Sequence, residues 1–308
     1  MKRSARLRAG VGMALALLLF AGAAGPCARD PQHPELGAPT PTRSVRGVLR
    51  LSAYGPAARG SANAPLRHRT VYVNGREYQG MEDNGLRGYL DGRFKFGWNQ
   101  ATQVHVRAGR RDSVPKYGEK ELFRALYRWD GIELPPQARV HGARVDIAVE
   151  RGPDRDLQIM LYAVRKDWNP GEGGVRRDNN SPPREGEVWW GALAHEREPW
   201  GLPGAGFASD AHPLADTSAM PLAETHYAPG QGRIVFESPE LAGYVERRVR
   251  EGRPLLFLLK LDDGLEDESR TLLLLHSGSR DDPWNPEQRP RLSLEWESPA
   301  EIATLERR

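Results

Sequence analysis

The sequence has a single cysteine, no apolar run long enough to cross a membrane and no segment that favours a long helix. Cys27 has no second cysteine to pair with, which excludes a disulfide framework, so stability must come from the core. The apolar run from Val11 to Phe20 is far shorter than the roughly 20 residues that span a bilayer. With 33 glycines and 25 prolines, turns are plentiful.

Blocks of like charge and catalytic motifs are also missing. The 44 basic residues nearly cancel the 41 acidic ones, and the net charge of +3 gives nucleic-acid binding no support. There is no Gly-x-Ser-x-Gly motif, and no glycine-rich phosphate loop follows a predicted strand. His195-Glu196 begins like a zinc-protease motif but lacks the second histidine, and Pro199 would break the required helix. These absences favour a non-catalytic protein.

The N-terminus has the pattern of an export signal. Four basic residues (Lys2, Arg3, Arg6 and Arg8) precede the apolar run, and small residues follow it. We therefore expect an exported protein that is periplasmic, outer-membrane-anchored or extracellular. Cys27 lies where a lipoprotein carries its lipidated cysteine, although Pro26 departs from the usual lipobox. Lipidation of Cys27 and ordinary cleavage after Ala23 or Ala24 both stay open, and a lipid anchor is the only membrane attachment that we expect.

Composition divides the chain into five parts. The signal segment (1–27) is followed by a proline-rich linker (28–45), a β-rich extension (46–100), a β-sandwich (101–297) and a polar tail (298–308). Within the extension, Asn74-Gly75 predicts a two-residue hairpin turn between Thr70–Val73 and Arg76–Tyr78. The extension is either an extra sheet layer or an independent subdomain.

Strand patterns dominate the region after residue 100. Residues 122–149 predict a strand, a turn at Pro135-Pro136 and a second strand in which apolar residues alternate with others. Further strands are predicted at 104–106, 157–164, 233–236, 255–261, 271–276 and 292–296. The continuous apolar run at 255–259 predicts a central strand with neither face open to water. No helix is long enough for parallel crossovers, so we predict an all-β fold, an antiparallel sandwich of the jelly-roll kind.

One short helix is predicted between two of these strands. Ser238 can cap it and Pro239 suits its first position, while Leu241, Tyr244, Val245 and Val249 form one apolar face. Gly252 and Pro254 end the helix.

The segment 122–149 resembles the opening of DNRLRE-type domains, with an arginine before its first strand. Arg289-Pro290-Arg291, which introduces the strand at 292–296, resembles the start of that family's final strand. The family consists of jelly-roll β-sandwiches of secreted bacterial and archaeal proteins, and some members bind carbohydrate. The resemblance covers roughly residues 101–297. Family members often begin their first strand with an aspartate, whereas this chain has Ala101-Thr102-Gln103, so no metal or ligand role is carried over from that residue.

The insert from 165 to 231 is the best candidate for a binding site. It contains four of the eight tryptophans together with amide and charged residues. Sugars stack on flat aromatic faces and pair their hydroxyls with planar amide or guanidinium groups. The predicted contacts to a polysaccharide or envelope glycan are Trp168, Asn169, Trp189, Trp190, Trp200 and Arg197. A tryptophan in a β-protein is more often core than ligand platform, and the resemblance implies that these tryptophans help to pack a long connection.

A structural calcium ion is the only cofactor that the sequence suggests. Asp262, Asp263 and Asp267 lie in the densest acidic turn, and exposed carboxylates on extracellular domains bind calcium weakly. A solvated acidic hairpin is the favoured alternative.

Three functions remain open. The preferred one is a non-catalytic exported module that binds polysaccharide or a cell-envelope glycan. The second is a structural or adhesive envelope protein, in which the insert tryptophans would be buried. A polysaccharide-degrading enzyme is the least favoured. The sequence does not indicate an oligomeric state.

Overall fold

A computed structural model describes residues 66–89, 105–112, 120–171, 183–201, 204–205, 216–266, 268–278 and 286–298. The predictions for the signal segment, the linker and Cys27 lie outside these residues, as does Asp267. None of the described helices is long and apolar enough to cross a membrane.

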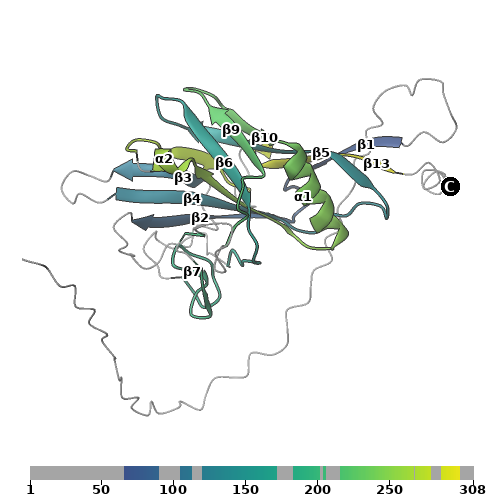
Figure 1. Cartoon of the computed structure of the whole chain (residues 1–308), viewed down its shortest axis with the longest axis horizontal. Coiled ribbons are helices and arrows are strands. Elements are labelled where there is room, and N and C mark those ends of the chain that lie inside the picture. The colour runs from purple at the N-terminus through teal and green to yellow at the C-terminus, as the bar shows by residue number, and fades with distance from the viewer. Residues whose placement is uncertain are drawn as a thin grey trace, which may run out of the picture. The chain divides into compact units, whose positions relative to one another are not determined.

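The described residues form mostly antiparallel β-structure (Figure 1), which confirms the predicted all-β class. The strands are β1 (Leu66–Tyr72), β2 (Met81–Tyr89), β3 (His105–Asp112), β4 (Lys120–Trp129), β5 (Arg139–Arg151), β6 (Leu157–Ala163), β7 (Ala192–Ala194), β8 (Glu198–Pro199), β9 (Ala223–Tyr227), β10 (Arg233–Glu237), β11 (Leu255–Leu261), β12 (Leu273–His276) and β13 (Arg291–Ser298). The helices are α1 (Pro239–Arg250), α2 (Asp263–Glu266) and a 3-10 turn at Pro286–Gln288.

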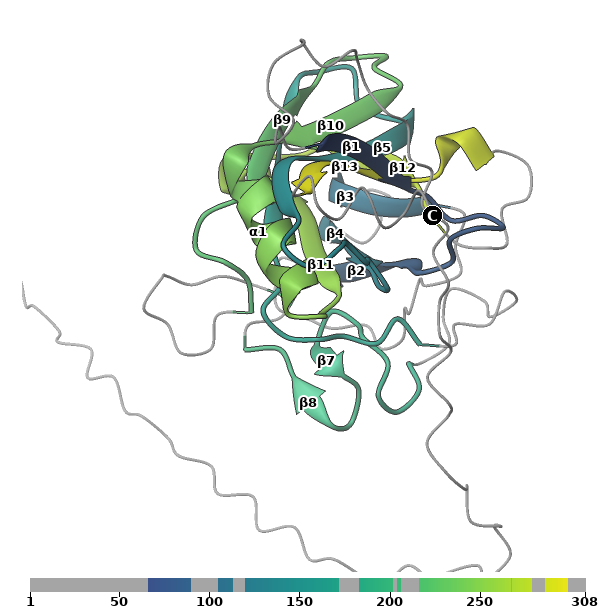
Figure 2. The ribbon, with the colours of Figure 1, turned by 90° about the vertical axis from the view of Figure 1, so that its right-hand side faces the viewer.

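Eleven of these strands form one curled sheet. Its main path runs β1-β13-β5-β12-β3-β4-β11-β6-β9, while β10 pairs with β5 and β2 pairs with β4. In Figure 2, β1, β13 and β5 lie above β4, β11 and β2, with the small β7–β8 hairpin beyond them. Strand β1 pairs with β13 from Leu66 opposite Ser298 to Tyr72 opposite Leu292. The first described strand and the last therefore lie side by side.

The curl depends on β3, which changes partner along its length. Residues 105–108 of β3 pair with β12, and residues 109–112 pair with β4. The change occurs at Gly109, whose φ of +98° is a backbone conformation that other residues rarely adopt. A side chain there would also collide with the carbonyl oxygen of Thr271. Gly109 thus permits one sheet to fold back over its own core.

The main core lies between the two halves of the curled sheet. Val145 and Ile147 of β5 point inward and alternate with less buried residues, as the period of two predicts. Strand β11 is buried along its whole length. Its odd-numbered residues enter this core, whereas Leu256 and Leu258 face a second apolar cluster on the other side. The prediction that this strand has neither face open to water is confirmed.

Helix α1 forms where the sequence predicts it. The Ser238 side chain accepts a hydrogen bond from the backbone N–H of Leu241 at 2.9 Å, which caps the first turn. Gly252 has a φ of +64° just beyond the last turn. The hydroxyl of Tyr244 donates to the carbonyl of Leu256 at 3.1 Å and accepts from its N–H at 3.0 Å, which ties the helix to β11.

The predicted hairpin at Asn74-Gly75 is wrong. Residues 76–78 form no strand, and β1 pairs with β13 instead of with a following strand. The Asn74 side chain instead donates to the carbonyls of Met81 (2.5 Å) and Gly278 (2.7 Å) and accepts from the Met81 N–H (3.0 Å). Long-range pairing thus outweighs the local turn preference, and both described strands of the extension belong to the main sheet.

Replacement of Gly109 by alanine should destabilise the fold by about 1–3 kcal/mol or more, because of the strained φ and the contact with Thr271. Gly243 of α1 is the matched control, since a Cβ there would meet open space. Gly243→Ala should raise the free energy of unfolding by about 0.5–1 kcal/mol. Urea unfolding of both variants measures the difference, and an unchanged Gly109→Ala protein would contradict this role.

Candidate functional site

The tryptophan-rich insert forms a second apolar core against the outer face of β4 and β11. The side chains of Trp168, Trp190 and Trp200 are only 2%, 7% and 4% exposed. They pack with the outward-facing leucines of the sheet, which are Leu86, Leu122, Leu126, Leu256 and Leu258. The indole N–H of Trp200 donates to the carbonyl of Trp189 at 2.7 Å. Three of the predicted sugar contacts therefore offer no aromatic face to a ligand in this conformation.

Trp190 shows how closely the insert is fitted to the sheet. A Cβ at Gly88 of β2 or at Gly204 would collide with the Trp190 indole. The guanidinium of Arg124 lies 5.4 Å from the centre of the same ring. Arg124 also donates to both carboxylate oxygens of Glu266, at 3.0 and 2.6 Å. The indole is thus held between two glycines and an ion-paired arginine, as core side chains are.

The other three predicted sugar contacts keep accessible side chains. Trp189 is half-buried and meets the ring of His195 edge-on at 5.8 Å, while Asn169 and Arg197 are exposed. Arg197 donates to Glu185 at 2.9 Å, and Asn169 accepts from the Gly171 N–H at 3.0 Å. The N–H of Val188 donates to the carbonyl of Asn169 at 3.1 Å, so residue 169 lies beside the 187–195 segment.

Two carboxylates of the acidic turn that follows β11 form contacts within the chain. Asp262 accepts a hydrogen bond from the Gly264 N–H at 3.0 Å, and Asp263 pairs with Lys260 at the start of α2. Asp267 lies outside the described residues. Among the residues that the structure describes, the group of three ligands close enough to share a metal ion lies elsewhere. The calcium site at this turn stays a prediction.

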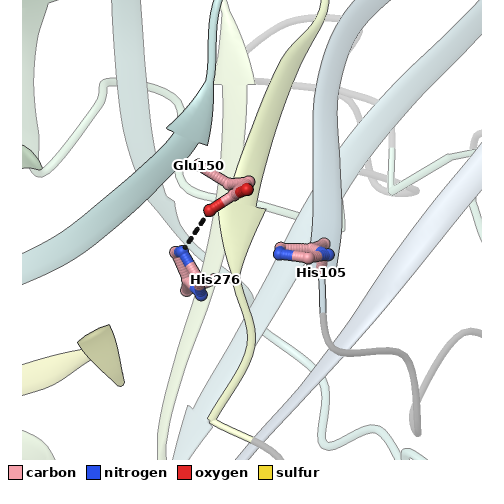
Figure 3. Close-up of side chains that lie close together, drawn as sticks. All are labelled: His105, Glu150 and His276. Atoms are coloured by element: carbon pink, nitrogen blue, oxygen red, sulfur yellow. Dashed lines mark hydrogen bonds and ion pairs between the residues drawn. The ribbon is translucent and has the colours of Figure 1, made fainter. Parts of the chain in front are cut away.

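That group consists of His105 on β3, Glu150 on β5 and His276 on β12 (Figure 3). One ligand atom from each residue lies within 4.8 Å of the other two. His276 Nε2 is 3.0 Å from Glu150 Oε2, and the two imidazole centroids are 5.0 Å apart at 62°. The His276 side chain is 4% exposed and that of Glu150 is 47% exposed. Two imidazoles and a carboxylate at this separation are a potential metal-ligand set.

Strand pairing explains why these three residues meet. His276 lies directly opposite His105, in a register that puts the two side chains on the same face of the sheet. Strand β5 borders β12 on its other side, with an irregularity in register at Leu274/Leu275. There, residues 149–151 of β5 oppose only two residues of β12, as in a β-bulge. Glu150 lies within this irregular segment, one residue after the partly buried Val149.

A row of basic residues adjoins this cluster. Arg107 follows His105 by two residues, and Arg107 and Arg151 are both paired with Leu274. Burial lowers the pKa of the Arg107 guanidinium, and the positive charges of Arg111 and Arg151 lower it further. A hollow of about 440 Å³ beside this row is lined by Arg110, Arg111, Asp112, Arg151, Gly152, Pro153, Arg270 and Leu272. Two of these arginines already pair with carboxylates of the chain, Arg110 with Asp112 and Arg111 with Glu121.

A larger hollow of about 800 Å³ lies between the Pro135-Pro136 turn and α1. Its lining includes Gln137 and Arg139 on one side and Glu246 and Arg250 on the other. It has polar groups but no aromatic ring, and therefore lacks the flat face on which a sugar stacks.

A buried carboxyl group lies beside the end of β12. Asp83 of β2 accepts hydrogen bonds from the Ser277 hydroxyl at 2.8 and 2.9 Å and from the N–H of Gly278. Burial raises the pKa of Asp83 to about 7, although these hydrogen bonds oppose the shift. Asp83 thereby fixes the position of Ser277, which directly follows His276.

Comparison with models of known protein families and with curated proteins finds no match for this chain. The resemblance to DNRLRE-type domains therefore stays a prediction that rests on strand and turn patterns.

None of His105, Glu150 and His276 is among the site residues predicted from the sequence. Val104-His105-Val106 and 271–276 were both predicted strands, and the histidines alternate there with core residues. That alternation places each imidazole on the outer face. Which strands are neighbours, however, cannot be obtained from spacing, because Glu150 and His276 are separated by 126 residues.

The raised pKa of Asp83 predicts a pH dependence of stability. An aspartate in the unfolded chain has a pKa near 3.9, so between about pH 4 and 7 the folded state binds more protons. The free energy of unfolding should therefore fall as pH rises through this window, by on the order of a few kcal/mol. Asp83→Asn should remove that fall and be the more stable protein at pH 8. Urea unfolding at several pH values tests this.

Asp154 supplies the control for this experiment, because it is an exposed carboxylate in the turn before β6. Asp154→Asn should keep the wild-type pH profile. Equal slopes for Asp83→Asn and wild type would show that Asp83 is not the group responsible.

Proposed function

We propose that this chain is a non-catalytic β-sandwich module of the cell envelope with a structural or adhesive role. The observation that carries this proposal is the burial of Trp168, Trp190 and Trp200 in the second core. Burial of the insert tryptophans is what distinguishes a structural role from sugar binding through those rings. The envelope location rests on the export signal that the N-terminal sequence pattern predicts.

The packing explains why the insert belongs to the scaffold. Leu122 and Leu126 of β4 and Leu256 and Leu258 of β11 form an apolar outer face that water would otherwise cover. A buried aromatic side chain removes 150–250 Å² from water, which makes three indoles an effective cover for this face. In this proposal the described part of the insert that carries Trp168, Trp190 and Trp200 is a cap over this face, whereas β9, at the end of the insert, belongs to the main sheet.

Glycan binding is the second candidate function, because three of the predicted sugar contacts remain accessible. Trp189, Asn169 and Arg197 remain accessible, and backbone hydrogen bonds connect the segments that carry them. A half-buried indole, an amide and a guanidinium on connected segments are the kinds of group that hold a sugar ring. Under this alternative the binding surface is the outer side of the insert and excludes the three buried rings.

Substitution of two adjacent tryptophans separates the two candidates. Trp190→Ala should lower the free energy of unfolding by about 3–5 kcal/mol, as truncation of a buried aromatic does. Trp189→Ala should cost clearly less, because its ring is only half-buried. In the structural role the wild-type protein is not retained on insoluble or soluble polysaccharides, with calcium or with a chelator. Urea unfolding and polysaccharide pull-down give the two readouts.

The opposite outcome is equally specific. Retention of the wild type on one glycan class, lost in Trp189→Ala or Arg197→Ala at unchanged stability, would establish the glycan-binding alternative. Quenching of tryptophan emission by acrylamide provides an independent check. Trp189→Phe should remove more of the quenchable emission than Trp190→Phe, and the reverse order would contradict the burial of Trp190.

A further inference from the structure

We propose that His105, Glu150 and His276 bind a divalent transition-metal ion, with Zn²⁺ as the probe. Two histidine nitrogens and one carboxylate oxygen form a ligand set that zinc and neighbouring first-row metals accept. This site is independent of the tryptophan insert and goes beyond the structural role proposed above.

The ligand atoms are already close to the separations that a metal needs. Zinc lies about 2.0–2.1 Å from nitrogen and oxygen ligands, so two ligands of a tetrahedral ion are about 3.3–3.4 Å apart. His276 Nε2 and Glu150 Oε2 are 3.0 Å apart, and one ligand atom from each residue lies within 4.8 Å of the other two. A bound ion would need His105 to move closer to the other two ligands, within the 4.8 Å that now separates the group.

The sheet positions the ligands before any metal arrives. His105 and His276 are direct partners across two hydrogen-bonded strands, and Glu150 comes from the strand on the other side of β12. Ligands carried on paired strands lose little conformational freedom on binding, which favours affinity. Figure 3 shows the two rings and the carboxylate gathered over these strands.

A second histidine distinguishes this cluster from an ordinary surface ion pair. His141 Nε2 lies 2.9 Å from Glu297 Oε2, which is as close as His276 is to Glu150. Among the described residues, no third ligand joins the His141–Glu297 pair. The His141–Glu297 pair is therefore a matched control for the cluster. It has the same histidine–carboxylate contact but, among the described residues, no second imidazole.

The position of the cluster indicates what a bound metal would do. Its ligands come from β3, β12 and β5, the three strands at which the curled sheet passes from one half to the other. A metal bound to all three would cross-link them and stabilise the folded state by mass action. Three protein ligands also leave a coordination position for water or another ligand, as in zinc sites that are not closed.

The test is Zn²⁺ binding by the full chain, produced without a polyhistidine tag and stripped with a chelator. Isothermal titration calorimetry at neutral pH should show one tight site per chain, and Zn²⁺ should raise the midpoint of thermal unfolding. Co²⁺ should give visible d–d absorption bands, which report nitrogen and oxygen ligands. Affinity should fall as pH is lowered, since protons compete for the imidazoles.

Variants locate the site. Glu150→Gln keeps a hydrogen-bond acceptor for His276 on a half-exposed side chain, so the variant should fold. Glu150→Gln and His105→Gln should each weaken the tight site by at least about tenfold, since loss of even an outer-shell partner of a metal ligand costs 10–100-fold. His141→Gln removes the control imidazole and should leave Zn²⁺ affinity and the Co²⁺ spectrum unchanged.

Two results would overturn the proposal. One is a wild-type protein that binds Zn²⁺ no better than folded Glu150→Gln and His105→Gln. The other is a tight site that survives both substitutions or disappears in His141→Gln, which would place the metal on other residues. Circular dichroism of each variant confirms that a lost site is not a lost fold.

Discussion

Strand β11 has apolar side chains on both faces, β4 adds Leu122 and Leu126 to the outer face, and the rest of the structure depends on covering these leucines. One face of each strand enters the core between the halves of the sheet, and the other presents leucines outward. A sheet cannot leave such a face in water, so a third layer has to cover it. The insert supplies that layer with Trp168, Trp190 and Trp200. Tryptophan suits sugar binding, but these three tryptophans are needed to cover the outer leucines of β4 and β11.

The second determinant is the path of the sheet around Gly109. Because β3 leaves β12 and joins β4 there, strand β12 is held between β3 and β5. That placement brings His276 between two other potential ligands from distant parts of the sequence. Asp83 supports the same region from β2 through its bonds to Ser277 and Gly278. The curl of the sheet and the proposed metal-ligand cluster therefore share strands β3 and β12.

The sequence predicted the features that depend on a single strand or helix. The alternation at Val145 and Ile147, the apolar run of β11 and the Ser238 cap each reflect the environment of a single element, and each is confirmed. Features that depend on partners distant in sequence were not predictable. Asn74-Gly75 has the chemistry of a hairpin turn, but β1 pairs with β13 and residues 76–78 form no strand. The His–Glu cluster requires strand order and an irregular register, neither of which sequence spacing contains.

The pairing of β1 with β13 has a consequence for modularity. Leu66 lies opposite Ser298, so the polypeptide enters and leaves the sandwich at adjacent points of the same edge. A domain whose ends are adjacent can be inserted into a surface loop of another protein without disrupting that protein's fold, or repeated in tandem. The β1–β13 pair is therefore also a suitable place to join the ends of the sandwich. A circular permutant with new ends in the β9–β10 turn should retain the sandwich. A side chain at Gly230 or Gly232 in that turn would meet open space.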